Sequence, residues 1–207
     1  MSIYLYSGTP GSGKSLHAAN DIRLALNRKN RPVLGNFELS QVAPVKSRDN
    51  YLYIPNEVLT PEKVTEYATE YWETGGRAFR EDWIYLVIDE AQLIFNSREW
   101  NRDMQRRMAW LEFLSQHRKY GVKVILLAQD AKMIDNQFRM LIEYECHHRK
   151  LSNFGLVGRL VGTLFLGRLY LWIMTYYSMN EVLEREFYLA SNKDFAMYDS
   201  YKRFERT

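Results

Sequence analysis

The chain has 207 residues, 46% of them hydrophobic and 14% aromatic, which is enough for one sizeable core. Its formal net charge of +3 is a small excess among 28 basic and 25 acidic side chains, so it is compatible with an acidic partner such as DNA but does not by itself indicate one. A single cysteine, Cys146, excludes an internal disulfide, and the first residues lack the pattern of a signal peptide. We therefore expect one soluble globular domain over residues 1–207 that works in a reducing cytoplasm.

Short apolar runs at residues 3–7, 84–88 and 122–128 predict strands. Each run is nearly continuous rather than alternating, which is typical of a strand covered on both faces of a parallel sheet. Weaker patterns at 31–39 and 51–54 indicate further short strands. Because each main run adjoins a helical pattern, we expect an α/β fold with a central, mainly parallel sheet flanked by helices.

Three amphipathic patterns predict the helices between these strands. The first begins at Ser15 and ends in the polar run 27–31, and its apolar face consists of Leu16, Ala19, Ile22 and Leu26. The second begins at Pro61 and is stopped by residues 74–76. The third covers about 101–119, and its apolar stripe consists of Met104, Met108, Leu111 and Leu114.

Residues 154–179 are hydrophobic enough to require a decision about a membrane span. Arg159 and Arg168 divide the stretch into pieces shorter than the roughly 20 apolar residues that a spanning helix needs. Residues 169–177 favour a buried strand, and 185–201 predict a further hairpin. We expect residues 1–150 to form the core and 151–207 an extension of the same domain with antiparallel strands. The alternative is a membrane-binding segment in which both arginines reach lipid phosphates.

The sequence GTPGSGKS at 8–15 has the glycine, lysine and serine spacing of a phosphate-binding loop (P-loop), and it lies between a strand and a helix. Glycines let the backbone N–H groups approach phosphate oxygens, and the helix adds its positive N-terminal end. Lys14 is expected to contact the β- and γ-phosphates of ATP, and the Ser15 hydroxyl to ligate Mg²⁺. The predicted nucleotide contacts are Gly8, Thr9, Pro10, Gly11, Ser12, Gly13, Lys14, Ser15 and Leu16.

Acidic and amide side chains follow two of the other predicted strands. Asp89, at the end of the run 84–88, is placed to hold Mg²⁺ through water, and Glu90 to polarise an attacking water. A purely structural explanation of Asp89 and Glu90 is that they cap the N-terminus of a helix. Gln129 follows the run 122–128, where its amide would orient water or sense the γ-phosphate. These residues favour an ATPase over a nucleotide kinase.

Two other functions fit the same loop. Nucleoside monophosphate kinases also open with a Gly-x-Pro-Gly-x-Gly-Lys pattern, but a kinase is expected to have an arginine-rich lid and no equivalent of Glu90. The third possibility is a non-catalytic nucleotide-binding or toxin-like module.

The order and spacing of several segments resemble the Zot family, the N-terminal ATPase domains of zonula occludens toxin-like and filamentous phage morphogenesis proteins. The segments are 8–18, 87–95, 117–121, 125–130 and 133–144. The resemblance covers roughly residues 1–150, and residues 196–205 also resemble the tail of the family. It implies an additional-strand ATPase related to the FtsK and HerA motors.

The resemblance also implies a ring in which one subunit completes the site of its neighbour, and a role in extruding phage DNA and virions through the host envelope. Implied partners are ATP, Mg²⁺, phage or host membrane assembly proteins and phage single-stranded DNA, with no heme or structural metal. Arg118 and Arg139 match positions from which an arginine would act on a neighbour's nucleotide, although each also fits a solvated surface arginine.

The chain departs from the family pattern in two ways. Ala128 precedes Gln129 where many members have threonine, and the sequence ends at Thr207 where phage members continue into a membrane helix. We therefore expect location at the inner face of the host membrane, through partners or a missing C-terminal anchor. Residues 145–148 include metal-ligand types, but neighbours on a strand point to opposite faces and cannot complete one site. Basic clusters at 106–107, 118–119 and 148–150 either line a DNA path or are solvated surface.

Overall fold

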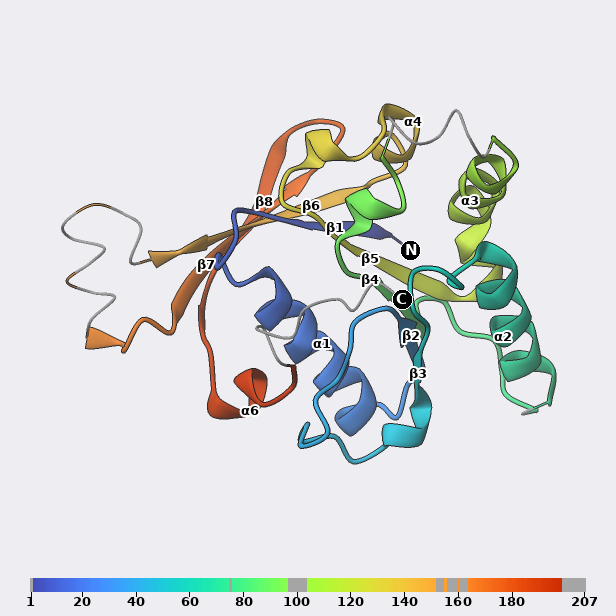
Figure 1. Cartoon of the computed structure of the whole chain (residues 1–207), viewed down its shortest axis with the longest axis horizontal. Coiled ribbons are helices and arrows are strands. Elements are labelled where there is room, and N and C mark those ends of the chain that lie inside the picture. The colour runs from blue at the N-terminus through green and yellow to red at the C-terminus, as the bar shows by residue number, and fades with distance from the viewer. Residues whose placement is uncertain are drawn as a thin grey trace.

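A computed structural model describes residues 2–74, 76–96, 104–151, 155, 160 and 164–198. Within these ranges eight strands form one sheet in the order β3-β2-β4-β5-β1-β6-β7-β8 (Figure 1). The strands are β1 Ile3–Ser7, β2 Val33–Gly35, β3 Tyr51–Tyr53, β4 Ile84–Ile88, β5 Val122–Leu127, β6 Tyr144–Lys150, β7 Leu169–Tyr176 and β8 Glu181–Leu189. The helices are α1 Lys14–Arg28, α2 Pro61–Thr74, α3 Met104–Gln116, α4 Asn136–Arg139 and α6 Asn192–Phe195.

The strands from β3 to β6 pair in parallel, whereas β7 and β8 add antiparallel strands at one edge. Parallel strands end at the same edge of a sheet, so the loops after β1, β4 and β5 lie beside one another. These are the loops that carry the predicted phosphate loop, Asp89 with Glu90, and Gln129. The predicted α/β architecture is confirmed.

Helices cover both faces of the parallel part of the sheet. On one face α1 packs Ala18, Ile22 and Leu26 against Val87 and Leu127, all of them buried. The opposite face is covered by α2 and α3 in a second cluster that includes Val64, Ala68, Trp110, Phe113, Leu86, Ile88 and Leu126. The continuous apolar runs are therefore strands buried on both sides, as their composition predicts.

The apolar stripe predicted for the third helix is wrong in its first half. Met104 and Met108 of α3 are exposed by 64% and 57%, and the buried face instead consists of Trp110, Phe113 and Leu114. Trp110 packs against Phe95 with ring centroids 5.4 Å apart. The aromatic residues bury more area than the methionines would, which rotates the helix toward them. Residues 97–103, including Arg102 of the predicted helix, lie outside the described residues.

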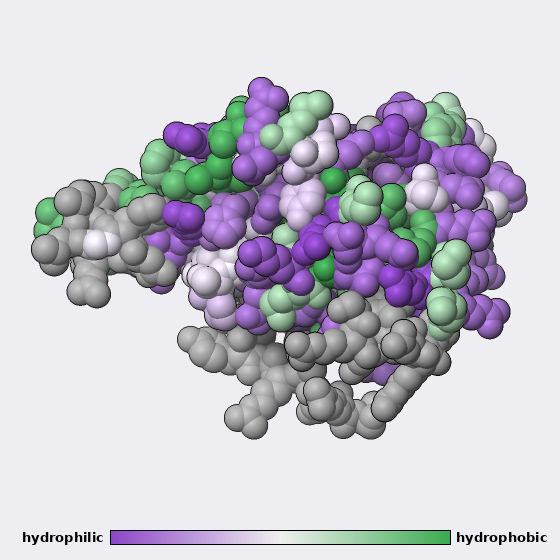
Figure 2. Space-filling model, turned by 90° about the horizontal axis from the view of Figure 1, so that it is seen from above, coloured by the Kyte–Doolittle hydropathy of each residue, from purple (hydrophilic) through white to green (hydrophobic). Residues whose placement is uncertain are grey.

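The region after β6 contains the predicted antiparallel pair, but the pair is less buried than expected. Residues of β7 are mostly half-buried, and most of β8 is exposed. Figure 2 shows hydrophobic surface gathered toward the end of the molecule that carries these strands. Its exposed apolar residues include Val182, Leu183, Phe187 and Leu189. The strand predicted to be buried at 169–177 is therefore mostly half-buried as β7.

The further hairpin predicted at 185–201 is also wrong. After β8 the chain forms the short helix α6, because Ser191 and Asp194 make a capping box in which each side chain bonds the backbone of the other. The hairpin that does form joins β7 to β8. No helix among the described residues has both the length and the apolar content to cross a bilayer. The first half of the stretch 154–179 is largely outside those residues.

Candidate functional site

The loop between β1 and α1 is closed by hydrogen bonds from its own backbone and from Lys14. The Ser12 N–H donates to the Thr9 carbonyl oxygen over 3.1 Å. The Lys14 ammonium donates to the carbonyl oxygens of Gly8 at 2.7 Å and Thr9 at 3.3 Å. Lys14 therefore lies over the loop that precedes it, with its charge inside the space that the loop encircles. The first turn of α1 contains no acidic residue that would oppose an anion there.

Close approach explains two of the three loop glycines. A Cβ on Gly8 would lie 2.5 Å from the carbonyl oxygen of His148, and one on Gly13 would lie 2.6 Å from the ring of Tyr170. Both distances are too short for a side chain, so the surrounding protein itself requires glycine at these two positions. A Cβ on Gly11 would meet nothing within 4 Å, and the role of Gly11 in the approach to phosphate stays a prediction. Gly11 instead has a φ of +74°, which glycine adopts without strain.

Asp89 and Glu90 are held at the end of β4 by two amide side chains. The Asn36 side chain accepts a 2.6 Å hydrogen bond from the Asp89 N–H and donates a 2.8 Å bond to the Asp89 carbonyl oxygen. The Glu90 N–H donates to the Asp89 carboxylate over 2.9 Å, and the Gln92 amide donates to the Glu90 carboxylate. Glu90 has a left-handed backbone with φ 47°. Such strain in a residue other than glycine is a feature of functional sites.

The carboxylates and Lys14 are close enough to perturb one another. Burial lowers the pKa of Lys14, and the charges of Glu90 and Asp89 oppose that change. Burial also raises the pKa of Asp89 to about 6; the Glu90 N–H and Lys14 favour its charged form and Glu90 disfavours it. The site therefore holds two carboxyl groups and only one positive charge, that of Lys14. This excess of acidic groups suits a further cation between them.

Gln129 adjoins the same loop through its backbone. Its carbonyl oxygen accepts a 3.1 Å hydrogen bond from the Gly8 N–H, and the preceding Ala128 N–H donates to the Tyr6 carbonyl oxygen over 3.0 Å. The Gln129 side chain is exposed, so its amide is available to a ligand. The structure thus brings together Lys14, Asp89 and Gln129, which lie far apart in the sequence.

The oxygen atoms available at the site fit a magnesium ion. Ser15 and Asp89 offer a hydroxyl and a carboxylate, the hard ligands that Mg²⁺ prefers, and Mg²⁺ usually completes its shell with water and phosphate oxygens. Among the described residues no three His, Cys, Asp or Glu side chains gather to hold a metal ion on their own.

The two predicted trans-acting arginines lie in different parts of the fold. Arg118 precedes β5, and its side chain pairs with Glu143 at 2.6 Å while 56% exposed. The six residues of β5 span about 20 Å between Arg118 and the edge that carries Gln129. Arg118 is therefore not placed to contact a ligand in the loop of its own chain. Arg139 is in α4 and bonds Asn136 at 2.9 Å.

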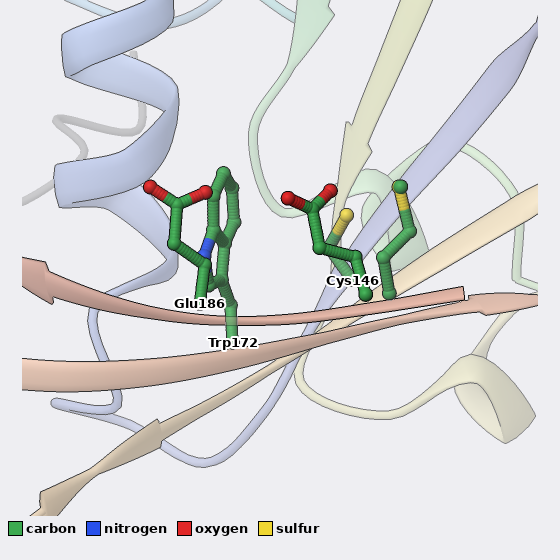
Figure 3. A pocket seen from close by; sticks show the side chains of 5 residues that line it. Cys146, Trp172 and Glu186 are labelled. Carbon is green, nitrogen blue, oxygen red and sulfur yellow. The ribbon is translucent and has the colours of Figure 1, made fainter. Parts of the chain in front are cut away.

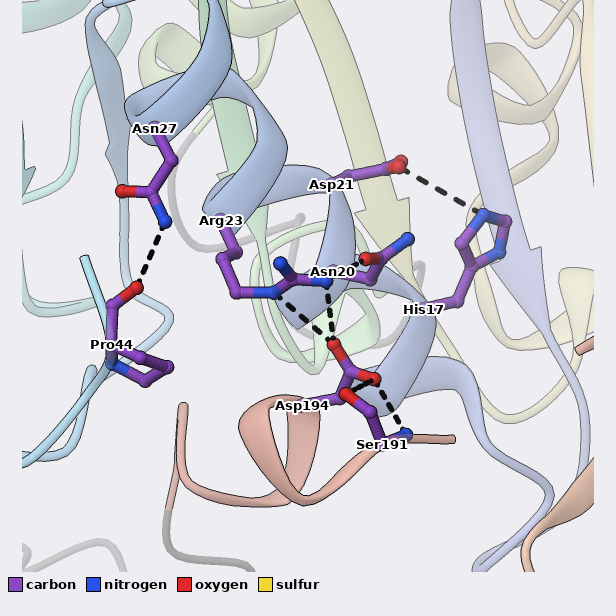
Figure 4. A network of polar contacts seen from close by, with 8 residues as sticks. All are labelled: His17, Asn20, Asp21, Arg23, Asn27, Pro44, Ser191 and Asp194. Carbon is purple, nitrogen blue, oxygen red and sulfur yellow. Dashed lines mark hydrogen bonds and ion pairs between the residues drawn. The ribbon is translucent and has the colours of Figure 1, made fainter. Parts of the chain in front are cut away.

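A buried pair of histidines, His17 on α1 and His148 on β6, lies beside the end of β1, where the loop begins. His17 Nδ1 and His148 Nε2 are 2.8 Å apart, and His148 Nδ1 lies 3.1 Å from the Ser7 carbonyl oxygen. A carbonyl can only accept, so His148 Nδ1 carries a proton, and in the neutral pair His17 donates to His148. Burial lowers the pKa of both histidines well below the usual value. Figure 4 shows His17 beside Asp21 on α1, with 4.0 Å between Nε2 and Oδ1.

The other ligand-type residues of β6 divide between two faces. Ser7 bonds Glu145 and His147 on one face, and Cys146 and His148 lie on the other, toward α1. Figure 3 shows Cys146, Trp172 and Glu186 among the residues that line a small pocket, with Trp172 next to Glu186 and Cys146 across from them. Burial raises the pKa of the Cys146 thiol to about 12, so it stays protonated at neutral pH.

Sequence reasoning missed the residues that support the site. Asn36 directly follows β2, so a polar residue immediately after a strand was the available signal for it. Gln92 lies in the turn after β4, two positions after Glu90, and had no such signal. His17 is three positions after Lys14, on the buried face of α1, and only the fold shows its partner. The approach of Tyr170 to Gly13 had no signal in the sequence at all.

Comparison with known proteins identifies the family of the chain and a relative in a phage. The family model described as Zonular occludens toxin (Zot) matches residues 2–176. The "Gene 1 protein" of Enterobacteria phage fd is 26% identical over 226 residues, which cover 97% of this chain and 59% of that protein. The chain therefore spans about three fifths of the length of this relative.

Solved structures share the fold at low sequence identity. The N-terminal domain of zonular occludens toxin from Neisseria meningitidis superposes with a TM-score of 0.59 at 18% identity, covering 96% of this chain and 98% of that one. The DNA-packaging ATPase from Sulfolobus Turreted Icosahedral Virus gives a TM-score of 0.56 at 15% identity, covering 90% and 96%. These likenesses show a P-loop ATPase fold.

Proposed function

Because the chain belongs to the Zonular occludens toxin (Zot) family, we propose that it is an ATP-hydrolysing motor subunit for filamentous phage assembly and DNA extrusion. The observation that carries the proposal is that Lys14, Asp89 and Glu90 lie close together. The charges of both carboxylates oppose the lowering of the Lys14 pKa by burial. The similarity to a phage protein and the fold shared with a DNA-packaging ATPase support the choice of a motor.

In this proposal the loop residues 8–16 bind the phosphates of ATP. Backbone N–H groups at the start of α1 face the phosphate oxygens, and Lys14 exchanges its bonds to the Gly8 and Thr9 carbonyls for the β- and γ-phosphates. Ser15 and Asp89 hold Mg²⁺, which neutralises phosphate charge when bound. Asp89 does so directly or through water, and Asn36 keeps its backbone in place.

Glu90 is assigned to the attacking water. Its carboxylate accepts a hydrogen bond from Gln92 on one side, which orients the group and leaves its remaining oxygen lone pairs for water. Gln129 offers its exposed amide from the neighbouring strand to orient that water or the γ-phosphate. A carboxylate poised on water favours hydrolysis over transfer to another acceptor.

Either Arg118 or Arg139 acts, in this proposal, on the nucleotide of an adjacent subunit. Arg118 lies away from the loop of its own chain, so its guanidinium would reach a nucleotide only from a neighbour in a homo-oligomeric ring. We further propose that residues 1–207 are one domain, since the sheet continues without a break from β3 to β8. The working place is the cytoplasmic side of the host membrane, with phage or host assembly proteins and single-stranded phage DNA as partners.

The test is the ATP turnover of the purified chain as a function of its concentration, with and without single-stranded DNA. A site completed by a neighbour gains specific activity as subunits meet, and a DNA motor responds further to DNA. Arg118→Ala and Arg139→Ala are compared separately, and the one that acts in trans regains turnover when mixed with a Glu90→Gln chain. A rate of ATP turnover per subunit that changes neither with protein concentration nor with single-stranded DNA would contradict the proposed motor function.

A further inference from the structure

Resting on the proposed function, we propose that His148 is a positioning residue whose imidazole ring bridges the two ends of the phosphate loop and holds the loop ready for ATP. One ring nitrogen, Nδ1, lies 3.1 Å from the carbonyl oxygen of Ser7, the last residue before the loop. The other, Nε2, lies 2.8 Å from Nδ1 of His17, in the first turn of α1 just after the loop. A single side chain of β6 therefore connects both ends of residues 8–15.

The entry to the loop is held from both neighbouring strands. The peptide bond between Ser7 and Gly8 is planar, so its carbonyl and its N–H have fixed relative directions. The carbonyl accepts a hydrogen bond from His148 on the β6 side, and the N–H donates over 3.1 Å to the Gln129 carbonyl oxygen after β5. The paired register of β1 and β6 ends at Ser7 opposite His147, and the His148 side chain adds the next hydrogen bond. These two bonds set the direction in which the chain leaves β1.

The exit from the loop is fixed through His17. Its ring stacks on Tyr6 of β1 with centroids 4.4 Å apart and makes an edge-to-face contact with Trp172 of β7. The His17 N–H donates over 3.0 Å to the Gly13 carbonyl oxygen, at the start of α1. A shift of His17 would therefore move the last glycine of the loop and the helix N-terminus that is proposed to face the phosphates.

Burial makes the bridge depend on His148 alone. The exposed fractions of Ser7, His17 and His148 are 1%, 6% and 3%, so water cannot replace either bond. The Ser7 carbonyl can only accept, which places a proton on His148 Nδ1 and leaves Nε2 of the neutral ring to accept from His17. Without the imidazole, the Ser7 carbonyl and the His17 N–H would both be buried and unpaired, and each would find a new partner only by moving one end of the loop. The nucleotide would then have to order the loop on binding, which lowers its affinity.

The experiment measures the affinity of the full chain for a non-hydrolysable ATP analogue with Mg²⁺ by calorimetry, together with the kcat and KM of ATP hydrolysis. His148→Leu removes both bonds. It is expected to lower the affinity about tenfold and to raise KM by a similar factor, with kcat within about twofold of its original value, because an ordering cost on binding acts on KM.

Two conservative variants divide the bridge into its halves. His148→Asn has an amide N–H near the place of Nδ1 and keeps the bond to Ser7, whereas His148→Gln has an amide oxygen near the place of Nε2 and keeps the bond to His17. Each is expected to recover part of the affinity, to within about threefold of the unsubstituted chain.

The matched control is His117, a second buried histidine with a bond of the same kind. Its Nδ1 lies 2.6 Å from the Leu114 carbonyl oxygen, and the residue precedes β5, at the edge of the sheet opposite the phosphate loop. His117→Leu is expected to lower the urea midpoint as His148→Leu does, while leaving the analogue affinity and KM unchanged.

The outcomes separate the bridge from the proposed function. If His148→Leu is less stable but binds the analogue as tightly as the unsubstituted chain, the histidine only supports the fold and the inference is wrong. An equal loss of affinity in His117→Leu would also overturn it. Should His148→Leu fail to fold, full affinity in both His148→Asn and His148→Gln would contradict the bridge. An unsubstituted chain that does not bind the analogue would overturn the proposed function itself, and this inference with it.

Discussion

Asp89→Asn is expected to stabilise the free protein near neutral pH while removing its response to Mg²⁺. The Asp89 carboxylate is held partly buried at the end of β4 beside Glu90, and burial raises its pKa from the usual 3.8 to about 6. An asparagine keeps the acceptor for the Glu90 N–H bond of 2.9 Å, so the substitution removes charge without removing that contact.

The size and sign of the change in stability follow from the raised pKa of Asp89. A group whose pKa is raised on folding binds its proton more tightly in the folded state, so its contribution lowers the free energy of unfolding as pH rises from about 4 to about 6. Each unit of difference is worth about 1.4 kcal/mol, and partial exposure reduces the total of two units to about 1 to 2 kcal/mol. Asp89→Asn is therefore more stable by that amount above pH 6, and the difference vanishes near pH 4.

Urea denaturation at pH 7.5 and near pH 4 checks both the magnitude and its pH dependence, since other titrating groups cancel between the two proteins. Mg²⁺ with a non-hydrolysable ATP analogue is then expected to raise the urea midpoint of the unsubstituted protein, but not the midpoint of the Asp89→Asn variant. A variant that is less stable at pH 7.5, or a difference that is the same at both pH values, would refute the reasoning about Asp89.

The remaining predictions concern the phosphate loop and residues 190–198, which follow β8. Gly13→Ala is expected to lower nucleotide affinity about tenfold more than Gly11→Ala, because only the first places a Cβ 2.6 Å from the Tyr170 ring; equal losses in a titration would contradict this. Asp194→Asn is expected to cost about 1 to 3 kcal/mol at neutral pH by breaking the ion pair with Arg23. Burial raises the pKa of Asp194, but its hydrogen bonds and Arg23 outweigh burial and lower it overall, so this stability is present above about pH 4 and is lost in stronger acid. A urea midpoint unaffected at pH 7 would show that the ion pair does not anchor α6 to α1.

The phosphate loop and the main strands could be predicted because their signals are local. Eight consecutive residues carry the chemistry of the loop, and the apolar runs before Asp89 and Gln129 show that both follow buried strands. Parallel pairing then requires these ends to meet, which the sheet order confirms. The capping pair Ser191 and Asp194 was also visible three residues apart, but the aromatic residues around it favoured a strand.

Other features depend on partners that are distant in the sequence. The rotation of α3 follows from Phe95, which reaches Trp110 from the loop after β4, and no spacing within the helix reveals it. The histidine pair requires β6 to lie beside β1, and the ion pair of Arg23 with Asp194 requires the residues after β8 to fold back against α1. Helical periodicity identifies which faces of a helix are apolar, but it does not show which of two apolar faces packs against the core.

Binding and hydrolysis of ATP by Glu90→Gln test the central claim most directly. Lys14→Ala serves as the control that loses nucleotide binding, because it removes the cation over the loop. The proposed site predicts that Glu90→Gln binds ATP with Mg²⁺ as tightly as the original chain and releases phosphate at least about a hundredfold more slowly. Full turnover by Glu90→Gln would contradict the assignment of this carboxylate and the hydrolytic site built around it.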